Sequence, residues 1–160
     1  MNPIDQYFNE EKFQCSVGLV ISILFLAVAA YFLYQPSSFY KGLAYSIMPI
    51  SFLFLMICTM IVLRTPKDIV RVKSFLTTEP LKLKTEELPR MNKIMNSFVI
   101  IKKVELGLLL LSLIICIVFW KNDLIKGITI GLIVQSVGLY YFDYNASARG
   151  AVYLDFLKSI

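Results

Sequence analysis

The sequence predicts an all-α membrane protein, a bundle of four transmembrane helices arranged as two antiparallel hairpins with a helical cytoplasmic segment between them. Three observations carry this prediction. The 160 residues are 58% hydrophobic with a mean hydropathy of +0.70, which is too apolar for an ordinary soluble domain. Apolar runs long enough to cross a bilayer occur twice before and twice after one long polar segment. That segment, from Arg64 to Glu105, contains ten of the sixteen Lys and Arg residues.

The chain is predicted to form a single membrane domain, residues 1–160, with spans at about 16–34, 42–63, 104–120 and 125–142. The first span differs from a signal peptide, because the tail before it is acidic on balance and its apolar run is too long. We therefore expect this span to remain in the membrane.

Basic residues predict the orientation of these spans. Four crossings place both termini and the central segment on one side of the membrane, where thirteen Lys and Arg residues lie, against three on the other side. The positive-inside rule then puts both termini in the cytoplasm of a cell whose inner (plasma) membrane holds the protein. Because the basic residues cluster beside span ends, the net charge of +5 is a topology signal, and we expect no nucleic-acid partner.

The first hairpin has clear start and turn signals. Asn2-Pro3 predicts a helix start, with the asparagine as cap and the proline in the first turn. A short interfacial helix around Phe8 is expected to precede the first span. The breaker-rich turn at 35–38 predicts that the first two spans are antiparallel. Pro49, inside the second span, predicts a kink because its ring removes one helical hydrogen bond.

The cytoplasmic segment, about 64–103, predicts two helices. Thr65-Pro66 supplies a cap and a first-turn proline for the first helix, and residues 77–80 should end it. The second helix is expected to run from Glu86 to Trp120, emerging from the membrane by several turns. Five charged residues are candidates for contact with lipid headgroups or for pairing at the interface: Lys82, Lys84, Lys102, Lys103 and Glu105.

The last span carries Gly127-x-x-x-Gly131, then Gln135 and Gly138, all near one helical face. Small residues let helix backbones approach closely, and a glutamine can form a hydrogen bond with another helix. These four residues are therefore the predicted helix-packing or partner-binding face, either inside the monomer or against a second chain. The tail, 146–160, predicts a helix lying on the inner membrane surface.

A constant offset in residue number relates the two halves of the chain. It aligns Phe13 with Phe98, Lys41-Gly42 with Lys126-Gly127, and Arg64 with Arg149. We call the step from Phe13 to Phe98 the repeat offset. Each half then consists of a hairpin followed by a cytoplasmic helix, which predicts a parallel repeat about an axis normal to the membrane. Few identities support the alignment, so the repeat is a hypothesis at this point.

The sequence lacks the residues and motifs of several common catalytic and metal-binding sites. The chain has no histidine, no cysteine pair with metal-ligand spacing, no phosphate-binding glycine loop and no nucleophile elbow. Cys15, Cys58 and Cys116 are widely spaced and odd in number, which favours reduced packing cysteines. We therefore expect a protein that is not an enzyme and that uses no cofactor or metal.

Three functions are open on this basis, in a chain typical of small bacterial inner-membrane proteins. The first is protein–protein binding in the membrane, for example as an immunity or accessory protein whose partner is another membrane protein or a secreted one. The second is a homo-oligomeric channel or pore subunit, built from copies of this chain. The third is binding of membrane lipids with anionic headgroups by the basic segment.

Overall fold

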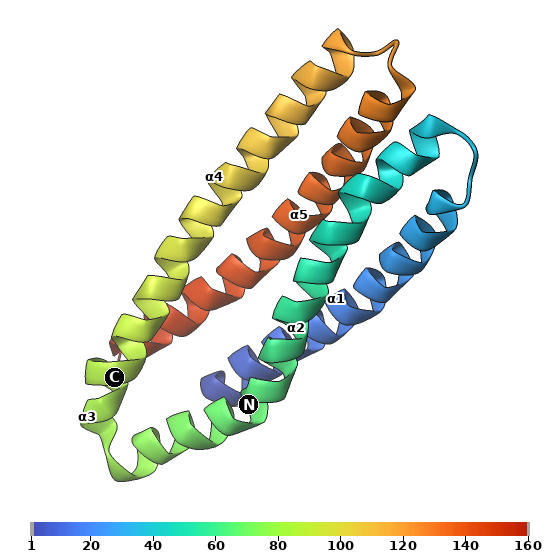
Figure 1. Cartoon of the computed structure of the whole chain (residues 1–160). Helices are drawn as coiled ribbons and strands as arrows, with labels where there is room; N and C mark the ends of the chain where they lie inside the picture. Colours follow the sequence, from blue (N-terminus) through green and yellow to red (C-terminus); the bar gives the residue numbers. More distant parts are fainter. Residues whose placement is uncertain (1, 160) are drawn as a thin grey trace.

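The computed structural model describes residues 2–159, and every regular element in that range is a helix (Figure 1). Four long helices make up most of the chain. In chain order the elements are α1 (Pro3–Leu33), α2 (Ser38–Thr78), the short α3 (Pro80–Lys82), the π-helical turn η1 (Leu83–Glu87), α4 (Leu88–Val118) and α5 (Asp123–Ser159).

Three of the long helices, α1, α2 and α5, are long and apolar enough to cross a membrane. The prediction of an all-helical chain is confirmed, and three of the four predicted crossings correspond to helices that could span a membrane. Helix α4 has the same length as α1, 31 residues, but Lys102, Lys103 and Glu105 lie directly before its apolar run. These charges shorten the uninterrupted apolar stretch of α4. By length and composition alone, α4 therefore does not qualify as a membrane-spanning helix, whereas α1, α2 and α5 do.

Side chains cap three of the long helices, and the cap of α1 lies where the sequence predicts a helix start. The Asn2 Oδ1 atom accepts a hydrogen bond of 3.1 Å from the Ile4 backbone N–H, with Pro3 in the first turn. Ser37 caps α2, and the Asn122 Oδ1 atom accepts a hydrogen bond of 3.2 Å from the Ile125 N–H at the start of α5. The short turns before α2 and α5 lie together at one end of the molecule.

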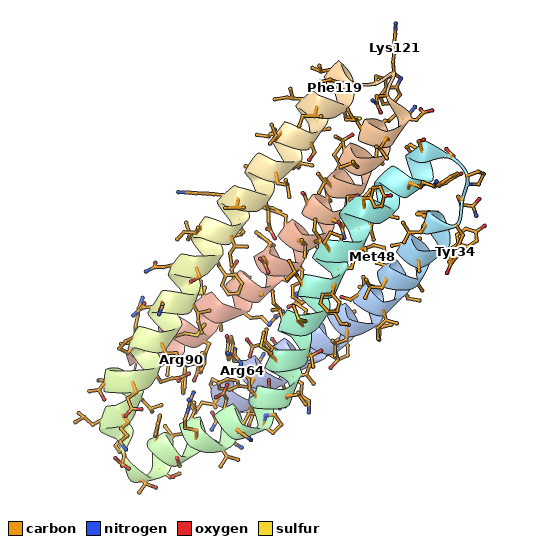
Figure 2. All side chains as sticks on the ribbon, in the orientation of Figure 1. Tyr34, Met48, Arg64, Arg90, Phe119 and Lys121 are labelled. Carbon is orange, nitrogen blue, oxygen red and sulfur yellow. The ribbon has the colours of Figure 1, made fainter. Side chains whose placement is uncertain are left out.

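Three predicted helix boundaries are wrong, because the long helices continue through them. Helix α1 has no break between its polar start and its apolar run. Helix α2 passes through Pro49 and Pro66 and ends at Thr78. The Thr65 hydroxyl donates to the Ile61 carbonyl instead of capping a new helix. Figure 2 shows that α2 changes direction near Arg64, and Pro66 lies two residues further along the chain. Helix α5 also continues unbroken, so the tail is its last part and not a separate surface helix.

The helix bounds follow the repeat offset. Applied to α1, the offset carries Pro3 to Leu88 and Leu33 to Val118, which are the first and last residues of α4. Applied to α2, it carries Ser38 to Asp123, which is the first residue of α5. The same hairpin therefore occurs twice in the chain.

The two repeats meet in a seam formed by Gly42 and Phe39 of α2 with Gly127 and Leu124 of α5. A Cβ atom on Gly42 would overlap the Leu124 carbonyl oxygen, and one on Gly127 would overlap the Phe39 carbonyl oxygen. The repeat offset relates Gly42 to Gly127 and Phe39 to Leu124, so the two contacts are equivalent. Reciprocal contacts of this kind are what a two-fold relation produces. The seam therefore supports the parallel repeat, and it requires glycine at both positions.

The four long helices form an open row and not a closed bundle. Helices α2 and α5 are central, α1 packs on α2, and α4 packs on α5. Within residues 2–159 the backbone of α4 approaches α5 and η1 but neither α1 nor α2. Helix α1 approaches α5 far less than it approaches α2. This arrangement leaves a space between α1 and α5.

The end of the molecule that holds both termini, the inner end, contains the main apolar core. Figure 2 shows Arg64 and Arg90 at this end, whereas Tyr34, Phe119 and Lys121 lie at the opposite end. The cap cluster consists of buried residues from α1, α2, η1, α4 and α5: Ile4, Tyr7, Phe8, Val72, Leu83, Met91, Tyr153 and Leu157. Since Tyr153 and Leu157 are buried here, the end of α5 belongs to the core.

Candidate binding groove

A groove of about 900 Å³ lies between α1 and α5, with α2 forming its floor. Its volume is near the upper end of the range of about 300–1,000 Å³ that is usual for ligand pockets. The walls are predominantly apolar: Phe13, Val17, Ile21, Phe25, Ile50, Phe54, Val134, Val137, Leu139, Tyr141 and Phe142. The groove follows from the open row, because no fifth helix covers α2 between α1 and α5.

One buried amide lies at the floor of this groove. The Gln135 Nε2 atom donates to the Ile47 carbonyl at 3.1 Å and to the Ser51 Oγ atom at 3.0 Å. These bonds join α5 to α2 close to the seam. The Gln135 Oε1 atom is buried and has no hydrogen-bond partner among the described residues. An unpaired acceptor in an apolar environment costs about 1–3 kcal/mol.

The four predicted packing residues divide into two pairs. Gly127 and Gly131 pack inside the chain, where added Cβ atoms would overlap Phe39 and Ser46 of α2. Gly138 also lies on α5 but has no atom within 4 Å of an added Cβ in the described structure. Gly138 and Gln135 both line the groove. The structure thus brings two of the four residues to the groove and packs the other two against α2.

Polar side chains line the inner end of the groove. The Arg149 guanidinium donates to the Gln14 side-chain oxygen, and the Gln14 amide donates to the Phe142 carbonyl at 2.8 Å. The Arg149 Nε atom is buried without a partner in residues 2–159. Asn9, Glu10 and Asn145 complete this end. The groove therefore combines an apolar body with a polar mouth near the cap cluster.

The five predicted headgroup-binding residues do not gather in one place. Lys82 pairs with Glu79 at 2.8 Å, and Lys84 is exposed on η1. Lys102 and Lys103 lie several turns further along a nearly continuous helix, about 27 Å away. Glu105 is 8% exposed and faces α5. The basic residues therefore form two separate groups and no single anion site.

Pairing also neutralises charge at the inner end. The Arg90 side chain donates to both carboxylate oxygens of Glu87 at 2.8 and 2.5 Å, and Arg71 lies 3.8 Å from the same carboxylate. The Tyr153 hydroxyl donates to Glu87 at 3.3 Å. Burial and the Glu87 charge raise the pKa of Tyr153, so its hydroxyl remains a donor at neutral pH. This network holds η1, α4 and α5 together.

Glu11, on the polar start of α1, gives a first testable prediction. Burial raises the pKa of Glu11 above its ordinary value, although Arg64, 3.6 Å away, opposes the shift. The folded chain therefore holds this proton more tightly than the unfolded chain. The resulting stability is complete below the unfolded pKa, about 4.3, and is lost as the pH rises through the raised folded pKa. We expect the melting temperature in detergent to fall across this window, and to fall less in Glu11→Gln. A steeper fall in Glu11→Gln than in the wild-type protein would contradict the assignment.

Sequence reasoning missed Ser51, Arg149 and Gln14 as groove residues. The repeat contained a partial signal, because the repeat offset aligns Ser51 with Ser136, next to Gln135. No pattern within α1 marks Gln14, since its role depends on a residue 135 positions away.

The described residues contain no group of three His, Cys, Asp or Glu side chains that could hold a metal ion. All three cysteines are free and buried. No protein-family model, curated protein or solved structure matches this chain.

Proposed function

We propose that this chain is a non-enzymatic protein of the inner (plasma) membrane that binds a transmembrane helix of another protein in the groove between α1 and α5. The proposal rests on two neighbouring residues of α5. Gly138 is exposed with open space around it, and the side-chain oxygen of Gln135 is buried without a hydrogen-bond partner among the described residues. Association of membrane helices depends on small residues that allow close backbone approach and on hydrogen bonds between helices. The groove offers both on one face of α5.

The proposed topology has four crossings with both termini in the cytoplasm. Helix α4 is the repeat counterpart of α1, with equal length and matching bounds, which supports a crossing by its apolar part. Thirteen of the sixteen Lys and Arg residues lie in the N-terminal tail, the central segment or the C-terminal tail, which four crossings put on one side, and this count supports a cytoplasmic location for that side.

The groove supports this function better than the alternatives. Lipid binding by the basic segment needs a concentrated positive surface, whereas the predicted lysines lie in two groups and Lys82 is paired with Glu79. A pore needs a polar path, and the surfaces of the open row outside the inner end are mostly apolar. The partner, as in an immunity or accessory protein, would present a small-residue face and one hydrogen-bond donor at the depth of Gln135.

Filling the groove tests the proposal. Gly138→Phe adds a large side chain where an added Cβ meets open space, so we expect it to leave the fold intact and to block the partner helix. The matched control is Gly107→Phe on α4, because Gly107 is equally unobstructed and does not line the groove. The measurement is recovery of the native complex in mild detergent, quantified by mass spectrometry.

We expect recovery of the heteromeric partner to fall at least tenfold for Gly138→Phe, which corresponds to about 1.4 kcal/mol, and to stay unchanged for Gly107→Phe. Equal recovery by both variants would refute binding in the groove. A complex containing copies of this chain alone would favour the pore-subunit alternative.

A further inference from the structure

A second polar site lies on the other side of α5, where α4 packs against it. Glu105 of α4 is 8% exposed, and its Oε2 atom is buried without a hydrogen-bond partner in the described chain. The Glu105 carboxyl group lies within hydrogen-bonding reach of the Asp143 carboxyl group of α5. A hydrogen bond between two carboxyl groups requires that one of them carries a proton.

A cavity of about 220 Å³ opens beside this pair. It is lined by Glu105, Leu106 and Leu109 of α4 and by Ser136, Val137 and Tyr140 of α5. Ser136 is 2% exposed, and its Oγ atom, like Glu105 Oε2, has no partner within residues 2–159. A cavity of this size with polar groups from both helices has room for several water molecules. It therefore provides a route for a proton to reach the carboxyl pair.

The charges around the pair are balanced when it holds one proton. Lys102 of α4 donates to the Ser147 hydroxyl of α5 at 3.0 Å, and its positive charge acts on both carboxyl groups. One shared proton leaves the pair with a single negative charge, which Lys102 neutralises. The other titratable groups nearby are the Tyr140 phenol in the cavity and the Cys58 thiol of α2 beside Asp143.

We infer that Glu105 and Asp143 form a proton-binding site, reached through the cavity, and that its single proton controls how tightly α4 packs on α5. Release of the proton to water leaves two adjacent carboxylates and one lysine, and therefore an unbalanced negative charge between the helices. Like charges this close repel each other, and burial in an apolar environment makes the repulsion stronger. Among the long helices of the described structure the α4 backbone approaches only α5, although α4 side chains also join the cap cluster, so this change acts on its main lateral support.

Infrared spectroscopy of the full-length protein in lipid nanodiscs tests the site directly. We expect the wild-type protein at pH 7 to show a protonated-carboxyl band that shifts in D₂O and disappears as one proton is released at higher pH. Glu105→Gln and Asp143→Asn should each remove this one-proton titration. Glu86→Gln and Asp155→Asn, at exposed carboxyl groups elsewhere, are the matched controls and should leave it unchanged.

Labelling of Cys116 with a small maleimide reports on the packing of α4, because this α4 thiol is buried. Thiolate formation raises the labelling rate with pH in every variant, so the rate is compared between proteins at the same pH. We expect the ratio of the wild-type rate to the Glu105→Gln rate, measured by peptide mass spectrometry, to rise several-fold above the titration pH. Absence of the band at pH 7, or a band that survives in Glu105→Gln, would overturn the proton site. A titration with no change in this ratio would overturn control of α4 packing.

Discussion

Replacing Gly127 with alanine is expected to destabilise the protein strongly, because a single Cβ atom at this position overlaps the Phe39 backbone. Backbone cannot move aside as a flexible side chain can, so α2 and α5 must separate along the seam. Overpacking of this kind costs about 1–3 kcal/mol, and more where the backbone must shift. Gly42→Ala should have a similar effect, because Gly42 occupies the equivalent position in the other repeat. The measurement is the melting temperature of each purified variant in detergent.

Gly107→Ala is the control for both seam variants. Alanine is a better helix former than glycine by about 1 kcal/mol, and no described atom lies within 4 Å of an added Cβ at Gly107. We therefore expect Gly107→Ala to be neutral or stabilising, opposite in sign to the seam variants. Unchanged melting temperatures for Gly127→Ala and Gly42→Ala would contradict the close approach of α2 and α5.

Glu87→Ala is expected to be the most damaging change at the inner end. The Glu87 side chain is 1% exposed and is the common acceptor for Arg90, Tyr153 and, at longer distance, Arg71. Removing one partner of a buried ion pair costs about 3–5 kcal/mol, because the other charge is left uncompensated. Burial alone lowers the pKa of Arg90, but its bonds to Glu87 more than offset this and raise the pKa. An arginine side chain does not lose its proton in proteins, so in the variant Arg90 stays charged without the Glu87 carboxylate.

The neighbouring Glu86→Ala serves as the matched control, since Glu86 is exposed one residue away on η1. Chemical denaturation in detergent should show a large loss for Glu87→Ala and a change within about 0.5 kcal/mol for Glu86→Ala. Equal losses for the two variants would show that helix propensity, and not the buried network, determines the effect.

The local features of the fold could be predicted because they depend on neighbouring residues. Capping and breaker signals predict three of them: the Asn2 cap, the two short turns at the end opposite the termini, and the end of α2 at Thr78. The continuation of α2 through Pro66 could not be predicted from the same signals. A proline in the first turn of a helix and a proline that bends a longer helix have the same local sequence.

The candidate site could be predicted in part. The sequence predicts a helix-packing or partner-binding face on α5, formed by Gly127, Gly131, Gln135 and Gly138. It does not predict which helix, if any, covers each of these residues. The structure shows that α2 covers Gly127 and Gly131, whereas Gly138 has no close neighbour. Near Gly138, α2 and α5 contact each other through the large rings of Phe54 and Phe142, with centroids 4.8 Å apart, and not through small residues as in the seam. The groove and the pairing of Glu105 with Asp143 depend on which helices are adjacent, which no local pattern contains.

Site-specific photo-crosslinking in native membranes tests the proposed function most directly. A photoreactive amino acid at Val134, which is exposed and lines the groove, is compared with one at Leu111, an exposed position on α4. Binding of a partner helix predicts one defined adduct with another membrane protein from Val134, no such adduct from Leu111, and loss of the adduct when Gly138→Phe is added. Adducts with lipid or with a second copy of this chain alone, or the same protein adduct from both positions, would contradict it.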